Sequence, residues 1–130
     1  MKAVTTISVL LLAASVSLPL QAQQTSANEQ IAALQQQGAE KADPQRGKLL
    51  WYAKNGTRSC ASCHGQSPLE TGRHAKTRKP IKPMALSKNP QLFTSRKKTE
   101  KWFLRNCKWT LGRVCTVQEK VDIMSWLSSQ

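Results

Sequence analysis

The sequence Cys60-Ala61-Ser62-Cys63-His64 decides the fold of this 130-residue chain, because it has the Cys-x-x-Cys-His spacing of a c-type haem attachment site. Two thiols at this spacing add to the two vinyl groups of one haem and form thioether bonds. The adjacent histidine reaches the iron from one face as an axial ligand. The motif therefore predicts one covalent haem c, held by Cys60 and Cys63, with His64 as an iron ligand.

A bare Cys-x-x-Cys pair also occurs in thioredoxin-like redox sites and in zinc sites. A thioredoxin-like site lies near a βαβ pattern, which this sequence lacks. A zinc site needs a second pair of ligands, but the remaining cysteines, Cys107 and Cys115, are eight residues apart and carry no histidine. The sequence also lacks a Gly-rich phosphate loop, a Ser/His/Asp set and paired carboxylates, so those enzyme classes are not indicated.

Residues 1–22 have the pattern of a secretory signal peptide. Lys2 gives a positive start, and residues 7–20 form an apolar run too short for a comfortable membrane span, which needs about 20 residues. A small-residue cleavage site follows at Ala22. Because haem c is attached outside the cytoplasm, we expect a bacterial periplasmic protein with no stable membrane insertion after cleavage. An uncleaved anchor is the alternative.

Residues 23–130 are enough for one small domain. Its first part, residues 23–42, is an extension rich in Gln and Ala. We expect a peripheral helix there over Asn28–Gln37, ended by Gly38. A disordered, polar leader is the alternative.

The next helix is predicted to start at Asp43-Pro44, an N-cap followed by proline at the first helical position. It should run through Trp51 and stop at Asn55-Gly56. Gly47 and Trp51 are four residues apart and share one face. The spacing indicates a close helix crossing, in which the glycine lets another helix approach and the indole fills the space beside it. Ordinary amphipathic packing is the alternative.

Residues 65–93 carry Gly, Pro and Asn without a sustained period, which indicates a loop. A helix is expected around Ser95–Arg105, and Thr116-x-x-Glu119 is a capping box that opens a final helix. No strand-like alternation appears, so the predicted fold is all-α. The core stripe of the final helix is expected to consist of Val117, Val121, Met124 and Leu127, with Ile123 and Trp126 beside it.

This order of elements resembles a class I cytochrome c over residues 43–129, and we assign residues 43–130 to a cytochrome c domain with one extra N-terminal helix before it. The resemblance implies that the first and last helices of the domain cross. It also implies a sixth iron ligand, usually a methionine from the later loop. The candidates are Met84, Met124, His74 and Asn106.

The spacing from His64 separates these candidates. Met124 lies on the core stripe, which indicates a packing role. His74 follows His64 by ten residues, too few to reach the opposite face of a haem, and is expected on the surface. Met84 follows by twenty residues and is expected to line the haem pocket, whereas Asn106 follows by 42 residues, about where the family's methionine belongs.

The surroundings of Asn106 resemble one branch of class I cytochromes, the asparagine-ligated, high-spin cytochromes c of the sphaeroides haem protein type. The matching stretches are Gly72-Arg73-His74-Ala75, Lys79–Ala85, Asn89-Pro90-x-x-Phe93-Thr94, Trp102–Cys107, Leu111–Thr116 and Glu119-Lys120-x-Asp122. The resemblance spans nearly all of the domain. One departure is Leu86, where the family pattern has proline, and it affects only the local loop shape.

The resemblance implies that Asn106 is the distal iron ligand and that Cys107 and Cys115 form a disulfide. An exported chain with two thiols left after haem attachment also favours their pairing. The short loop gives a modest entropic stabilisation of about 2–3 kcal/mol, and the bond would stiffen the backbone beside Asn106. The alternative role for Asn106 is a helix C-cap.

An asparagine oxygen is a hard, neutral and weak donor that suits ferric iron better than ferrous iron. Reduction should therefore loosen Asn106 and let oxygen, nitric oxide or carbon monoxide bind. We favour such a ligand-binding electron-transfer protein over an enzyme. The alternatives are a plain electron carrier ligated by Met84 and a haem oxidase, peroxidase or nitric oxide dioxygenase.

The chain is strongly basic, with a formal net charge of +13. Residues 73–113 contain thirteen Lys or Arg and one acid, Glu100. Nucleic acid is not expected for an exported haem protein, so we expect electrostatic steering toward an acidic redox partner. The resemblance implies a dihaem cytochrome c as electron donor, linked to a membrane cytochrome b. A merely solubilising surface is the alternative.

Overall fold

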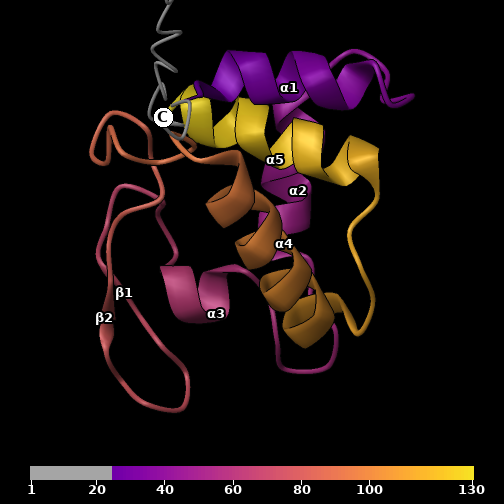
Figure 1. The fold of residues 1–130 in the computed structure, drawn as a ribbon. Coiled ribbons are helices and arrows are strands. Elements are labelled where there is room, and N and C mark those ends of the chain that lie inside the picture. Colours follow the sequence, from indigo (N-terminus) through magenta and orange to yellow (C-terminus); the bar gives the residue numbers. More distant parts are fainter. Residues whose placement is uncertain (1–24) are drawn as a thin grey trace, which may run out of the picture.

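The computed structural model describes residues 25–130 (Figure 1), and the predicted signal peptide, residues 1–22, lies outside the described residues. The described chain is mostly helical, as predicted. Its helices are α1 (Ala27–Gln35), α2 (Pro44–Tyr52), α3 (Ala61–His64), α4 (Arg96–Leu111) and α5 (Val117–Ser128). No helix within these residues has the length and apolar character needed to cross a membrane.

The stretch predicted as a loop, residues 65–93, contains one small addition to the predicted all-α fold. Strands β1 (Gly72–Arg73) and β2 (Pro80–Ile81) pair antiparallel, with Gly72 opposite Ile81. Strands of two residues are too short to show an alternating pattern, which is why the sequence did not indicate them.

Local capping explains where the helices begin. The Asp43 carboxylate accepts hydrogen bonds from the backbone N–H groups of Gln45 and Arg46 and so caps α2. Thr116 and Glu119 form the predicted capping box of α5. Helix α1 begins at Ala27, one residue before the predicted Asn28.

The sequence also contains the capping box of α1, which the prediction missed. Ser26 and Glu29 cap each other's backbone N–H groups at the start of this helix. The helix ends at Gln35, and the turn after it contains Gly38 with φ +103°. The predicted peripheral helix is therefore present, but it begins one residue and ends two residues earlier than predicted.

Two helix ends differ from the prediction. Helix α2 ends at Tyr52, three residues before Asn55, and an extended Ala53 terminates it. Helix α4 does not stop at Arg105 but continues to Leu111, where Gly112 takes a left-handed conformation with φ +72°. No glycine or proline precedes Gly112 in this segment, so nothing in the chain ends the helix earlier.

The predicted close crossing lies between α2 and α5. A Cβ at Gly47 would stand 2.1 Å from the backbone oxygen of Asp122, so only glycine permits this approach. Trp51, four residues further along α2, is 2% exposed, and its ring lies 5.3 Å from that of Trp126. The glycine and the indole therefore have the roles that their spacing indicated.

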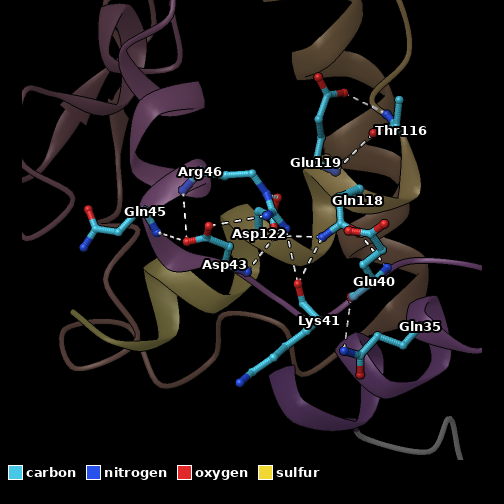
Figure 2. Close-up of polar contacts among 10 residues, drawn as sticks. All are labelled: Gln35, Glu40, Lys41, Asp43, Gln45, Arg46, Thr116, Gln118, Glu119 and Asp122. Atoms are coloured by element: carbon cyan, nitrogen blue, oxygen red, sulfur yellow. Dashed lines mark hydrogen bonds and ion pairs between the residues drawn. The ribbon is translucent and has the colours of Figure 1, made fainter.

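A polar network closes the crossing at the edge of the core (Figure 2). The Asp122 carboxylate is 3% exposed and accepts hydrogen bonds from the Arg46 guanidinium, the Gln118 amide and the backbone N–H of Asp43, at 2.7–3.1 Å. Burial would raise the pKa of Asp122, but these hydrogen bonds outweigh it and lower that pKa. The charged carboxylate thus ties the end of the N-terminal extension and α2 to α5.

The hydrophobic core forms around α5, with α1 packed on one side and α2 crossing on another (Figure 1). Three of the four residues of the predicted stripe, Val121, Met124 and Leu127, are at most 1% exposed, whereas Val117 is half-buried against the core. In contrast, α4 has no similarly extensive packing against another element of the described chain. Its position depends on the packing of Phe103 against the core, on the Cys107–Cys115 disulfide and on an ion pair between Glu100 and Lys120.

Candidate haem site

The two thiols of the Cys-x-x-Cys-His motif lie at the start of α3 and within it. Cys60 is the residue before this short helix and Cys63 lies within it, so the spacing of three places both on one helix face. Both are free and half-buried in the structure. Burial raises the pKa of the Cys60 thiol to about 11, and the neighbouring Cys63 contributes in the same direction. This raised pKa keeps the unattached thiol protonated at neutral pH.

His64 is the last residue of α3 and lies beside Trp51 at the crossing of α2 and α5. Its ring centroid lies 5.5 Å from that of Trp51, and the Trp51 indole N–H donates a hydrogen bond of 3.3 Å to the carbonyl of Gly65. Burial lowers the pKa of His64 to about 4, which favours the neutral imidazole that binds metals. Its Nδ1 atom is enclosed and has no hydrogen-bond partner within the described residues.

Strand β1 packs against the Cys-x-x-Cys-His motif. A Cβ at Gly72 would lie 2.3 Å from the Cys63 oxygen and 2.7 Å from the Cα of His64. The backbone of β1 therefore lies directly against the end of α3, and only glycine fits there. Sequence reasoning missed this contact and that between Trp51 and His64, because no local pattern links these positions.

Asn106 lies within α4 on its inward side. It follows Phe103 by three residues and precedes Thr110 by four, so the three share a face. Asn106 and Phe103 are half-buried and Thr110 is buried, whereas Lys108 on the opposite side is exposed. The Asn106 side chain is half-buried, and its amide is not among the fully enclosed unpaired groups of residues 25–130.

The helix-capping alternative for Asn106 is wrong. Its backbone is helical and five further helical residues follow it, up to Leu111, and the C-cap is Gly112. The sulfur atoms of Cys107 and Cys115 are bonded in the structure, so the expected disulfide is present and joins α4 to the segment before α5. Asn106 therefore sits beside a covalent anchor.

The other three candidates for the sixth ligand lie in different surroundings. Met124 is fully buried in α5, as the packing interpretation predicted. His74 is exposed after β1, and its Nδ1 accepts a hydrogen bond from the N–H of Thr77. Met84 is half-buried against the core, and its N–H donates to the carbonyl of Pro68.

The residues present fit a covalent haem. Two half-buried thiols remain free while the other two cysteines are bonded to each other. Next to them, a neutral imidazole has one enclosed ring nitrogen without a partner. Helix α4, with little packing of its own, presents Phe103 and Asn106 on its inward face. Together these features provide attachment points, an axial donor and a helix with little packing against the other helices.

The chain is similar to known c-type cytochromes. A family model described as "Domain of unknown function (DUF1924)" matches residues 37–127. The chain is 37% identical to the cytochrome c-type protein SHP of Cereibacter sphaeroides over 126 residues, which cover 93% of this chain and 97% of that protein. It is also 34% identical to cytochrome c'' of Methylophilus methylotrophus over 89 residues, 65% of this chain and 62% of that one.

Solved structures show the same relationship. The structure of oxidised SHP, described as an oxygen-binding cytochrome c, matches with a TM-score of 0.77 and covers 82% of this chain and 99% of SHP. Oxidised cytochrome c'' from M. methylotrophus matches with a TM-score of 0.71 at 26% identity, covering 80% and 94% of the two chains. The chain therefore belongs to the DUF1924 family of c-type cytochromes, together with SHP.

Proposed function

We propose that this chain is a periplasmic cytochrome c with a single covalent haem, which accepts electrons and binds a diatomic gas. Cys60 and Cys63 would form the thioether bonds, His64 would be the proximal ligand and Asn106 the distal one. The free thiols beside a neutral imidazole support the attachment. The likeness to SHP, an oxygen-binding cytochrome c, supports the gas-binding role.

The observation that carries the proposal is the position of Asn106. Its side chain is half-buried on the inward face of α4, and its amide oxygen can act as a donor. The amide is not fully enclosed, so a ligand as well as water can reach it. The disulfide at the next residue holds the backbone in place.

A bound haem supplies one-electron redox chemistry and a coordination position for a small gas. The chain's contribution is a distal donor whose affinity for the haem iron would depend on the oxidation state of that iron. The neutral Asn106 oxygen would suit ferric iron better than ferrous iron, so it would hold the oxidised haem more firmly than the reduced one. Once free, the amide N–H of Asn106 can donate a hydrogen bond to the gas that takes its place. Phe103, on the same helix face, would exclude water.

We also propose that α4 guides an acidic redox partner to this site. Lys97, Lys98 and Lys101 are exposed on the helix that carries Asn106. Trp102 is 51% exposed, and the Lys101 Nζ lies 5.9 Å from its ring centroid. An exposed tryptophan among cations is typical of a docking surface for an acidic protein. A dihaem cytochrome c linked to a membrane cytochrome b would meet this description.

The proposal is tested by spectroscopy of the protein matured in a bacterial periplasm. The haem should remain with the protein in acidified organic solvent, because thioether bonds are covalent. The reduced protein should be high-spin and should bind carbon monoxide. A low-spin reduced spectrum, with a methionine-to-iron band in the oxidised form, would instead identify Met84 as the ligand. Extractable haem would contradict the covalent attachment.

A further inference from the structure

Phe93 adopts a backbone conformation that bulky residues rarely take. Its φ is +63°, in the left-handed region, although its side chain is buried in the core and only 7% exposed. This conformation costs roughly 1–3 kcal/mol for a residue other than glycine, and it persists only where surrounding contacts enforce it. Phe93 stands two residues before Ser95, the N-cap of α4.

Hydrogen bonds from the N-terminal extension hold the Phe93 backbone, in addition to the packing of its side chain in the core. The side-chain amide of Gln30, in α1, donates a 2.6 Å hydrogen bond to the carbonyl of Phe93 and a 2.7 Å bond to the Thr25 hydroxyl. Thr25 donates its hydroxyl to the same Phe93 carbonyl at 3.2 Å and its backbone N–H to the carbonyl of Thr94 at 3.0 Å. Gln30 is only 3% exposed, so water does not compete for these bonds.

The start of α4 therefore has a defined anchor, which matters because this helix packs little against other described elements. Glu100 is held by Lys120 at 2.6 Å, and the disulfide holds Cys107. The hydrogen bonds to Phe93 and Thr94 fix the point at which the chain enters the helix. In Figure 1 the chain enters α4 below α5, on the side of the molecule where α1 begins.

We infer that Gln30 is a positioning residue for Asn106, so that the N-terminal extension sets how firmly the distal position is occupied. Asn106 lies eleven residues beyond Ser95, about 16 Å along the helix axis. A helix behaves as a stiff rod, so a shift at its first turn changes the place of a side chain further along. This inference rests on the proposed role of Asn106 as the distal ligand.

The consequence concerns the oxidised protein. An external ligand that binds ferric iron must displace Asn106, so its apparent affinity falls as Asn106 is held more firmly. Removing the Gln30 donor should release the start of α4 and weaken the internal ligand. External ligands should then bind more tightly to the oxidised protein, although the hydrogen-bond partners of the Gln30 side chain are Thr25 and Phe93 and not the motif at residues 60–64.

The test compares two variants of the haem-loaded protein, Gln30→Met and Gln36→Met. The first keeps the side-chain length but removes the donor, and the second makes the same change at an exposed position of the turn after α1. Thr25→Val gives a second removal of hydrogen bonds at a half-buried site if Gln30→Met does not fold. Hydrogen exchange of the backbone amides of residues 99–103 and imidazole titration of the oxidised protein are the two measurements.

In Gln30→Met we expect exchange at residues 99–103 to accelerate about tenfold, which corresponds to the loss of one net hydrogen bond of about 1.4 kcal/mol. Exchange at residues 121–127 of α5 should stay unchanged. The imidazole affinity should rise between about threefold and tenfold, since part of that loss reaches Asn106. Gln36→Met should change neither measurement.

The outcomes separate this inference from the proposed function. Unchanged exchange at residues 99–103 would overturn the anchor, whatever ligand the haem has. Faster exchange with unchanged imidazole affinity would overturn the link from Gln30 to Asn106. An Asn106→Ala variant with the imidazole affinity of the unmodified protein would instead reject Asn106 as the ligand, which is the proposed function.

Discussion

The indole of Trp51 lies against the imidazole of His64, with ring centroids 5.5 Å apart, and its N–H donates to the carbonyl of Gly65. Trp51 also packs edge-on against Trp126 of α5. One buried side chain thus connects the helix crossing to the haem motif. The orientation of the proposed proximal ligand therefore depends on the packing of the core.

Trp51→Ala should lower the free energy of unfolding by about 3–5 kcal/mol, because it removes a large, fully buried side chain. Denaturant unfolding of the haem-loaded protein measures the change. The neighbouring Leu49, which is 73% exposed, provides the control, and Leu49→Ala should change the free energy by less than about 0.5 kcal/mol. Equal losses of unfolding free energy in Trp51→Ala and Leu49→Ala would show that the buried packing of Trp51 does not stabilise the fold around His64.

Gly47→Ala should prevent the close crossing of α2 and α5. The new Cβ would stand 2.1 Å from the Asp122 oxygen, and a backbone atom cannot rotate away. We expect a loss of about 2–3 kcal/mol in the free energy of unfolding. Lys48→Ala, at the next and exposed position, should leave stability nearly unchanged. A stable Gly47→Ala protein would mean that the helices can move apart at little cost.

The Asp122 network predicts how stability responds to acid. Hydrogen bonds lower the pKa of Asp122 below its ordinary value of 3.8 in spite of burial. A lowered pKa means that the stabilisation is complete above pH 3.8 and is lost as the pH falls through the folded-state pKa. Asp122→Asn should therefore cost about 2 kcal/mol at neutral pH and flatten this acid dependence.

Unfolding free energies measured between neutral pH and pH 3 test this prediction. Glu70→Gln removes an exposed carboxylate and serves as the matched control. The control should keep the acid dependence of the unmodified protein. If Asp122→Asn also kept it, the network would have no role in acid stability.

The signals that sequence reasoning interpreted correctly are local ones. Asp43-Pro44 and Thr116-x-x-Glu119 fix helix starts through side chains that bond to nearby backbone groups, so a few adjacent residues suffice to predict them. The core stripe of α5 follows from helical periodicity. The role of Gly47 followed from its spacing to Trp51 on one face.

The features that the sequence analysis missed are of two kinds, local signals that were overlooked, such as the Ser26–Glu29 capping box, and contacts between distant residues. The position of Asn106 inside α4, rather than at its end, follows from the absence of a helix-ending residue before Gly112 and from the anchor at Cys107. The fit of Gly72 against His64 joins residues that no periodic pattern relates. The hydrogen bond from Gln30 to Phe93 spans 63 residues of chain.

The basic surface of α4 should control the rate of electron uptake from an acidic cytochrome. Reversal of Lys97, Lys98 and Lys101 to Glu should lower the association rate about tenfold or more at low salt, while the absorption spectrum stays the same. The rate for the unmodified protein should also fall as salt rises, because charges are screened within about 8–10 Å at physiological ionic strength.

Stopped-flow reduction measures these rates. A control with the same change in net charge reverses three exposed lysines elsewhere in the chain, Lys41, Lys48 and Lys54. This control should slow association much less. Equal effects of the two triple reversals would mean that net charge alone, and not the surface of α4, attracts the partner.

The most direct test of the central claim is carbon monoxide binding to reduced Asn106→Met, compared with the unmodified protein and with Met84→Leu. Methionine binds ferrous iron firmly, so Asn106→Met should become low-spin on reduction and bind carbon monoxide at least about tenfold more weakly. Met84→Leu should keep the high-spin spectrum and the affinity of the unmodified protein. If Asn106→Met behaved like the unmodified protein while Met84→Leu lost its low-spin ligand, Asn106 would not be the distal residue.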